Sequence, residues 1–465
     1  MERDEATARE ARTGLGLLLA LEIGVAAILV LAPLPEGSVR EPARTALEIA
    51  SLALGLSWIV LAARRSVVLP PRTALAGALG LLLLAAAQAL PLGAGVVGAL
   101  SPRALEVRTE PRPPAGAAAS EARLLGRDPA TLDPLPTLSV DAGATASALR
   151  TGAALAALLL VAAAVAAERG PRGVALALLA TAAIQGLHGT LDAAGSGRLA
   201  SGTFVNKNHF AGLLAMALPA GIGLAISVWK GGPGERAGLA RFVGGEGARA
   251  LLLGLLALVG LSGLLLSLSR AGIAVGAVGI VATFAASGRR RLGARLAAAA
   301  IVLAIAAVPL AQIGAERLAE GYARVPEEIT GAGSRGTVWG DTLSMVAAFP
   351  AVGTGFGTFA SAYPLFRSPD VRHLFLHAHC DPLQVLSEGG VVGLALLLLL
   401  AAPVLRRTVW GLGGAGGPVA AGMAAGILAA VLHSLVDFNF HVPSNAATAA
   451  VLAGTMLGLP WRARS

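Results

Sequence analysis

Long apolar runs recur along almost the whole chain, and they constrain its fold more than any other feature. A helix that crosses a bilayer needs about 20 mostly apolar residues. Twelve runs approach this length, at residues 14–33, 45–63, 73–92, 148–167, 173–191, 209–229, 250–268, 271–287, 296–313, 383–404, 417–437 and 442–459. Because backbone polar groups inside a bilayer must pair with one another, the sequence predicts an all-α, polytopic membrane protein of about 12 transmembrane helices.

The composition agrees with this fold and excludes several others. Of the 465 residues, 55% are hydrophobic, 14% are charged and only 4% are aromatic. Soluble domains carry about 25% charged residues, and few aromatics with much Ala, Leu and Gly favour packed helices over a β-barrel. The one cysteine, Cys380, excludes an internal disulfide and a cysteine-based zinc site. The spacing of Gly272 and Gly276 suits a close contact between helices.

The distribution of basic residues predicts which way the helices cross the membrane. Fifteen Lys and Arg residues lie in one alternating set of short loops, against five in the opposite set. By the positive-inside rule the richer loops are cytoplasmic, and so are both termini. The net charge of +9 therefore reflects helix orientation and contact with anionic lipid headgroups, and does not indicate nucleic-acid binding. No cleavage-site pattern follows Gly14–Ala32, so we expect a retained helix there.

On this topology the whole chain, 1–465, is a single integral membrane domain with two long segments in the periplasm or its equivalent. Residues 101–147 are rich in Pro, Ala and Arg and show little helical periodicity. Residues 314–382 include a predicted short helix at Thr337–Phe349 and then the Gly-rich AVGTGFGTF. The spacing of these glycines and their side of the membrane do not fit a nucleotide loop. We expect 314–382 to carry part of the active site.

Three arginines on the predicted outer face are candidates for binding a phosphate group. Arg270 lies in a short loop with apolar residues on both sides, Arg335 in a Gly-rich turn one helical turn before Trp339, and Arg198 near a membrane entry. A planar guanidinium fits phosphate oxygens, and two or three arginines at one mouth would suit a diphosphate. The plainer alternatives are an Arg270 that snorkels to a headgroup and, at Arg335, a solvated loop arginine or a helix-start contact.

A histidine pair precedes the apolar run that begins at residue 383. His379 is a candidate general base, because an imidazole of ordinary pKa, about 6.5, is largely neutral at ambient pH. Two alternatives stay open: a histidine that caps or packs at a helix start, and a metal site of His377, His379 and Asp381, which lacks a supporting carboxylate cluster. Glu388 lies two turns inside the run and needs a partner or a proton; a structural role is one possibility.

Two more polar segments fall on the predicted outer face. The first precedes the run at 209–229, and its Asn206 and Asn208 are candidate helix caps. The second, HSLVDFNFHVPSNA, links the last two runs. Its polar residues either line the same mouth or cap the helices. The residues in question are Lys207 and His209 in the first segment, and Asp437, Asn439, His441 and Asn445 in the second.

At these residues the chain resembles the O-antigen ligase and O-antigen polymerase family of membrane glycosyltransferases. The family's pattern, His-Asn-x-x-Leu-Gln-x-x-x-Glu-x-Gly-x-x-Gly, is matched at His379, Leu383, Gln384, Glu388, Gly390 and Gly393. Cys380 replaces the usual Asn, and Pro382 stands where an aromatic residue is common. SRAG at 269–272 and SRGTVW at 334–339 resemble the family's two arginine motifs. Together with the segments at 198–212 and 433–446, the similarity runs from about residue 195 to 446.

The resemblance implies a bacterial inner-membrane enzyme that works on the periplasmic face without a metal or other cofactor. Its donor would be a glycan linked to undecaprenyl diphosphate. Its acceptor would be a hydroxyl of lipid A core, of another glycan or of a different molecule, in lipopolysaccharide or surface polysaccharide assembly. Carried over to this chain, Arg270 and Arg335 would bind the diphosphate, and His379 would act as the base or orient the acceptor.

The sequence leaves the acceptor and some rival functions open. A polymerase with a lipid-linked acceptor, protein O-glycosylation and exopolysaccharide assembly differ from a ligase only in acceptor. A transporter of lipid-linked sugars typically has ionisable residues near the bilayer midplane and repeated halves. Here the charges gather at the outer edge, and we find no repeat. A glycolipid-binding family member without activity is a third class, for which Cys380 and Pro382 are the only hints.

Overall fold

The computed structural model describes residues 2–109, 136–231, 245–287, 334–369, 371 and 374–460. Within these ranges the regular elements are all helices. Nine of the described helices are long and apolar enough to cross a membrane, which confirms the predicted all-α, polytopic fold. They are α2 (Glu41–Arg64), α3 (Arg72–Ala89), α7 (Ala142–Arg169), α8 (Arg172–Ser196), α9 (Lys207–Gly231), α11 (Gly245–Leu266), α12 (Arg270–Ser287), α18 (Asp381–Leu412) and α19 (Gly417–Ser434).

Three of the twelve predicted spans are not among these nine helices. The first falls in α1 (Glu2–Leu31), whose apolar part is the shorter stretch Leu15–Leu31. The last corresponds to α20 (Pro443–Gly458), a helix of 16 residues. The span expected at 296–313 lies outside the described residues. The number twelve therefore stays a prediction.

The chain divides into two compact units. Unit 1 comprises Met1–Ala74, Ala153–Gly321 and Ala401–Ser465, and unit 2 comprises Leu75–Gly152 and Tyr322–Leu400. Residues 381–400 of α18 thus belong to unit 2. That the chain forms one integral membrane domain remains our expectation.

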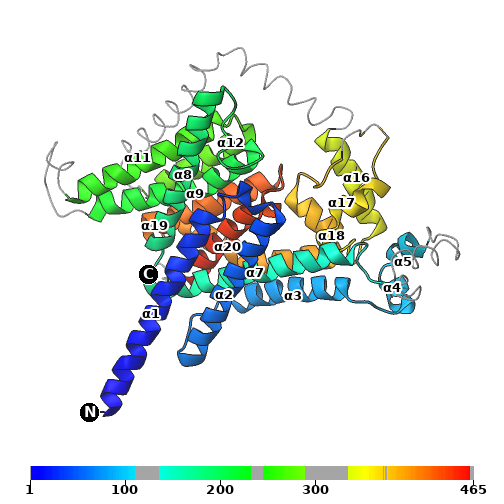
Figure 1. The fold of residues 1–465 in the computed structure, drawn as a ribbon, viewed down its shortest axis with the longest axis horizontal. Helices are drawn as coiled ribbons and strands as arrows, with labels where there is room; N and C mark the ends of the chain where they lie inside the picture. The colour runs from blue at the N-terminus through cyan, green and yellow to red at the C-terminus, as the bar shows by residue number, and fades with distance from the viewer. Residues whose placement is uncertain are drawn as a thin grey trace. The chain divides into compact units, whose positions relative to one another are not determined.

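Five helices, α8, α9, α11, α12 and α19, pack together in unit 1 (Figure 1). Small residues allow them to approach closely. A Cβ on Gly186 of α8 would lie only 2.5 Å from the Cα of Gly260 in α11. A Cβ on Gly272 of α12 would lie 2.4 Å from the Cβ of Ala211 in α9. Gly272 and Gly276 thus have the structural role that their spacing suggests.

Several connecting loops of unit 1 meet at one end of this bundle. Thr203 donates a hydrogen bond from its Oγ1 to the carbonyl oxygen of Pro33 (2.6 Å). The N–H of Ala200 donates to the carbonyl oxygen of Leu266 (3.1 Å). These contacts join the α1–α2, α8–α9 and α11–α12 loops. At the opposite end of the bundle, just before α8 begins, Arg169 forms an ion pair with Glu22.

From residue 334 onward, unit 2 contains three short helical elements: α16 (Arg335–Ala348), α17 (Phe359–Ala362) and the 3-10 helix η3 (Tyr363–Leu365). α16 corresponds to the helix predicted at 337–349. Its buried face packs Val338 and Met345 into a core with Phe359. Residues 314–333 of the predicted outer segment lie outside the described residues.

The segment 101–147 is more helical at its ends than its composition suggests. α5 (Pro102–Thr109) lies at its start, and residues 110–135 lie outside the described residues. α7 begins at Ala142, ahead of the predicted start at 148, because Asp141 caps it. The Oδ1 atom of Asp141 accepts a hydrogen bond from the N–H of Ala144 (3.0 Å). An aspartate before a small-residue run is a start signal that the hydropathy pattern alone does not register.

Candidate active site

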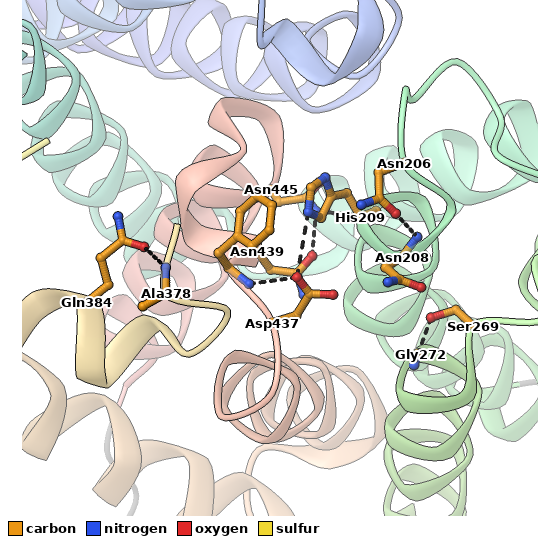
Figure 2. A network of polar contacts seen from close by, with 11 residues as sticks. Asn206, Asn208, His209, Ser269, Gly272, Ala378, Gln384, Asp437, Asn439 and Asn445 are labelled. Carbon is orange, nitrogen blue, oxygen red and sulfur yellow. Dashed lines mark hydrogen bonds and ion pairs between the residues drawn. The ribbon is translucent and has the colours of Figure 1, made fainter. Parts of the chain in front are cut away.

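The segment that carries the histidine pair is fixed to two helices of unit 2 through Ala378. The side-chain Oε1 of Gln384, in α18, accepts a hydrogen bond from the N–H of Ala378 (3.1 Å; Figure 2). Trp339, in α16, donates from Nε1 to the carbonyl oxygen of Ala378 (3.0 Å). Ala378 itself is fully buried. The next residue, His379, has a φ of +54°, in the left-handed region that histidine rarely adopts. Gln384 and Trp339 therefore fix the backbone of Ala378, and with it the position where His379 begins.

Gln384 also connects the histidine pair to the buried carboxylate of Glu388. Its Nε2 lies 3.1 Å from Nδ1 of His377 and donates to Oε1 of Glu388 at 3.1 Å. Glu388 is only 2% exposed. Its two oxygens accept further hydrogen bonds from the N–H groups of Gly357 (2.9 Å) and Phe359 (3.0 Å). Three donors compensate the burial of this carboxylate, so the contacts of Glu388 are those of a structural residue.

The Gly-rich segment after α16 packs around α18 at a kink. Gly390 has φ +63° and ψ −165°, a combination open almost only to glycine. A Cβ there would lie 2.3 Å from the carbonyl oxygen of Ala351, and one on Gly353 would lie 2.2 Å from the carbonyl carbon of Glu388. The N–H of Gly355 donates to the carbonyl oxygen of Glu388 (2.9 Å). The glycines of the segment are thus explained by backbone packing.

Replacing Gly390 by alanine is expected to destabilise unit 2 by about 2 kcal/mol or more, since it combines backbone strain with a steric clash. The matched control is Gly340→Ala in α16, where a Cβ meets nothing within 4 Å. That change is expected to be neutral or to stabilise by up to about 1 kcal/mol. Thermal melting of the purified protein in detergent measures both. Equal melting temperatures for the two variants would contradict the packing described for Gly390.

Two further residues at the start of α18 lie close to the histidine pair in sequence. Asp381 is the first residue of the helix and is buried; a carboxylate there interacts favourably with the positive end of the helix dipole. Burial raises the pKa of the Cys380 thiol; a backbone hydrogen bond with Leu383 lowers it, and the charge of Asp381 adds to the rise. Among the described residues, no group of three or more His, Cys, Asp or Glu side chains is arranged to hold a metal ion.

Arg335 lies on the same helix as the tryptophan that contacts Ala378. It is the first residue of α16, with Ser334 at the N-cap position, and it is half-buried. Residues four apart lie on one face of a helix, so Arg335 and Trp339 share a face of α16. Arg335 therefore lies on the face of α16 whose Trp339 binds the peptide that precedes His379.

In unit 1, two cations occupy the first positions of membrane helices. Lys207 begins α9, and its Nζ donates to the carbonyl oxygen of Leu268 (3.3 Å) in the turn before α12. Arg270 begins α12, and the Oγ of Ser269 accepts a hydrogen bond from the N–H of Gly272 (3.3 Å) there (Figure 2). The N-terminus of a helix carries partial positive charge, which disfavours cations and favours anions. Two cations at such ends make this part of unit 1 strongly attractive to an anion.

The α8–α9 loop holds the remaining residues of this predicted group. Asn206 caps α9, because its Oδ1 accepts a hydrogen bond from the N–H of Asn208 (2.8 Å; Figure 2). The capping interpretation of Asn206 is thus confirmed. Arg198 has an exposed side chain, and its N–H donates to Oγ of Ser196 (3.2 Å).

A buried polar network joins the start of α9 to the loop between α19 and α20 (Figure 2). Asn445 donates from Nδ2 to the carbonyl oxygen of His209 (2.9 Å) and to Oδ1 of Asn439 (3.1 Å). Nε2 of His209 lies 3.7 Å from Oδ1 of Asp437. A Cβ at position 212 would lie 2.3 Å from Oδ1 of Asn439, so Gly212 makes room for this side chain. His441 is half-buried in the 3-10 helix η4 (Asn439–His441) of the same loop.

Asp437 is charged at neutral pH despite its burial. Burial works to raise its pKa, but the polar contact and charge of His209, the N–H of Phe438 and the charge of His433 together lower the pKa to about 2. A carboxylate with a lowered pKa stabilises the fold above its unfolded value of about 3.9. That contribution is lost only as the pH falls from about 4 through about 2.

The predicted site residues fall into two groups. Unit 1 holds Arg198, Lys207, Arg270, Asp437 and His441, and unit 2 holds Arg335, His377, His379, Asp381 and Glu388. The structure adds three connections: Gln384 contacts His377 and Glu388, Trp339 donates to the carbonyl oxygen of Ala378, and His209 lies beside Asp437. The i, i+4 spacing of Gln384 and Glu388 is the only signal in the sequence that could have indicated one of these connections.

Fold and site together define a multi-pass, α-helical membrane protein with cations and an imidazole at or near the starts of its helices. Residues 255–398, less than a third of the chain, match a family model described as O-antigen ligase. Over these residues the chain is similar to that family, which supports an O-antigen ligase and polymerase assignment and agrees with the resemblance of its motifs. A search of curated proteins finds no match. The family supports a membrane glycosyltransferase role in polysaccharide assembly, with lipid-linked glycans as the general class of partner.

Proposed function

We propose that the protein transfers a glycan from undecaprenyl diphosphate to an acceptor hydroxyl at the periplasmic face of the bacterial inner membrane. The acceptor oxygen attacks the anomeric carbon of the donor, and His379 takes the hydroxyl proton. The bond between that carbon and the diphosphate oxygen breaks, and undecaprenyl diphosphate leaves with the electron pair. The donor's own sugar–diphosphate bond supplies the free energy, so the reaction needs no ATP. As the resemblance implies, it also needs no metal.

The observation that carries this proposal is the way His379 is presented. A general base must lie within hydrogen-bond reach of the proton that it removes, and its position must be fixed. Gln384 and Trp339 fix the preceding peptide from two different helices. All three residues lie in the segment that matches the O-antigen ligase family.

The proposed anion-binding residues are argued separately in each unit. In unit 2, Arg335 shares a helix face with Trp339 and so lies on the side of α16 that faces Ala378. In unit 1, Arg270 and Lys207 add their charges to two helix N-termini. Guanidinium groups stabilise the charge that develops on a departing diphosphate. We assign diphosphate binding to Arg270 and Arg335, and a supporting role to Arg198 and Lys207.

The charge distribution between the two ends of unit 1 supports a periplasmic location for its proposed anion-binding residues. The loops that contain Arg198, Lys207 and Arg270 meet at one end. At the other end, Arg65 pairs with Glu168 near the close of α2 and α7. The latter end belongs to the loops rich in basic residues, which the positive-inside rule places in the cytoplasm.

The decisive experiment combines purified protein in lipid nanodiscs with a synthetic undecaprenyl-diphosphate oligosaccharide and two acceptors. We expect undecaprenyl diphosphate to be released in proportion to glycan transfer, and the rate to be unchanged by a chelator such as EDTA. A single transfer to lipid A core defines a ligase, whereas growth of a lipid-linked chain defines a polymerase, our alternative. Movement of intact donor across the bilayer without release of diphosphate would instead identify a transporter and reject the proposal.

A further inference from the structure

We infer that Phe375 is a positioning residue for His379, and that Tyr363 and Asp341 hold Phe375 in place. This inference rests on the proposed role of His379 as the base. The hydrogen bonds at Ala378 fix the backbone before His379, but they do not set the side-chain torsions of the imidazole. An aromatic stack in unit 2 contacts the imidazole ring directly.

The stack consists of four rings from α17, η3 and the segment before α18. The rings of Phe359 and Tyr363 are stacked, with centroids 5.1 Å apart and planes at 14°. Tyr363 meets Phe375 edge to face, at 6.3 Å and 78°. Phe375 then meets the imidazole of His379 edge to face, at 5.6 Å and 84°. Edge-to-face ring pairs attract each other beyond the area that they bury, so this contact favours one orientation of the imidazole.

A buried carboxylate anchors the stack at Tyr363. The hydroxyl of Tyr363 donates to Oδ2 of Asp341 (2.8 Å), and Tyr363 is fully buried. Asp341 also accepts hydrogen bonds from the N–H (3.1 Å) and the Oγ of Ser368. Burial, and then the hydrogen bond to and charge of Asp341, raise the pKa of Tyr363, against a smaller lowering by Arg367. The phenol therefore remains a hydrogen-bond donor at every physiological pH.

These contacts join α16 to the imidazole by a second route, independent of Trp339. Asp341 and Trp339 lie in the same helix, α16. The imidazole of His379 and the backbone before it are therefore both held in place by contacts that start from this helix. Catalytic groups need to be held within about 0.5 Å of the productive geometry, and an error of about 1 Å can reduce a rate about 100-fold. Loss of the ring contact should reduce turnover without affecting the affinity for the donor.

The test compares Phe375→Leu with Phe366→Leu. Both phenylalanines pack, partly buried, against the same hydrophobic core, but the ring of Phe366 pairs with Phe349, whereas the ring of Phe375 pairs with His379. We expect Phe375→Leu to lower kcat about 10-fold with KM for the donor within about 2-fold of wild type. Phe366→Leu should keep kcat within about 2-fold, and Phe375→Tyr should restore most of the activity because it keeps the ring.

A second measurement separates this inference from the proposed function. Diethyl pyrocarbonate modifies accessible imidazoles, and mass spectrometry of the peptide that contains His379 gives the rate at that residue. The rate should rise several-fold in Phe375→Leu and stay at the wild-type value in Phe366→Leu. Equal kcat losses and equal modification rates in the two variants would overturn the positioning role. Full activity of a variant without His379 would instead overturn the proposed function, and the modification rates would still report on the ring contact.

Discussion

Glycan transfer is expected to fall by about 10²–10⁴-fold when His379 is replaced by asparagine, because the base that takes the acceptor proton is removed. Asparagine is a better replacement than alanine at this position. The φ of His379 is +54°, and asparagine tolerates left-handed backbone better than other non-glycine residues. The variant should therefore fold normally. Release of undecaprenyl diphosphate under saturating donor and acceptor measures the loss.

His188→Asn is the matched control for this substitution. His188 has an exposed side chain in α8 of unit 1, and its replacement should leave both turnover and melting at wild-type values. His379→Ala adds a second comparison, since the strain of a left-handed alanine should cost about 1 kcal/mol of stability on top of the lost activity. Normal turnover by a well-folded His379→Asn protein would show that the imidazole is not the base.

The features of the fold that could be predicted are those encoded locally. The apolar runs predict the membrane helices because each helix must satisfy its own backbone within the bilayer. The α16 helix follows a turn signal and has local periodicity, and Asn206 caps α9 through a neighbour two residues away. The apolar run at 148–167 predicts a start for α7 that is too late. Hydropathy locates only the apolar residues, whereas the cap at Asp141 sets where the helix begins.

The connections that build the candidate site could not be predicted because they are not local. The hydrogen bond from Trp339 to Ala378 joins residues far apart in the sequence, in different elements. His209 lies in α9 and Asp437 in the loop between α19 and α20, at positions far apart in the sequence. No periodicity or spacing in one sequence encodes such pairs. The kink at Gly390 also depends on a carbonyl group of another segment, that of Ala351.

Glu388 shows how far reasoning from the sequence could go and where it stopped. A carboxylate two turns into an apolar run needs a partner or a proton. The sequence predicts this requirement, but it does not indicate which groups bind the carboxylate. Its partners include two backbone N–H groups from the Gly-rich segment and the amide of Gln384. Backbone donors have no side-chain signature, so their identity becomes visible only in the folded unit.

Arg270→Ala is expected to lower kcat/KM for the lipid-linked donor by about 10²–10³-fold, because a cation at the departing diphosphate is lost. Arg270→Lys should recover only part of this, since an ammonium keeps the charge but loses the planar fork that fits two phosphate oxygens. Steady-state rates over a series of donor concentrations give the values. The control is Arg40→Ala in the α1–α2 loop of unit 1, whose side chain is 73% exposed and pairs with Glu36. That variant should retain wild-type kcat/KM, which separates a specific contact from the general field of the basic loops.

Stability should move differently from activity in these variants, and the difference distinguishes a binding residue from a structural one. A cation in the first turn of a helix is unfavourable by about 0.3–1 kcal/mol, so removing Arg270 relieves a cost that offsets the contacts it loses. Melting of Arg270→Ala should therefore stay close to wild type while transfer collapses. Lys207→Met should lower the melting temperature, because Nζ of Lys207 donates to the carbonyl oxygen of Leu268 and holds the turn before α12. A large drop in the melting temperature of Arg270→Ala, in step with its activity, would mean that Arg270 holds the fold together and does not bind the donor.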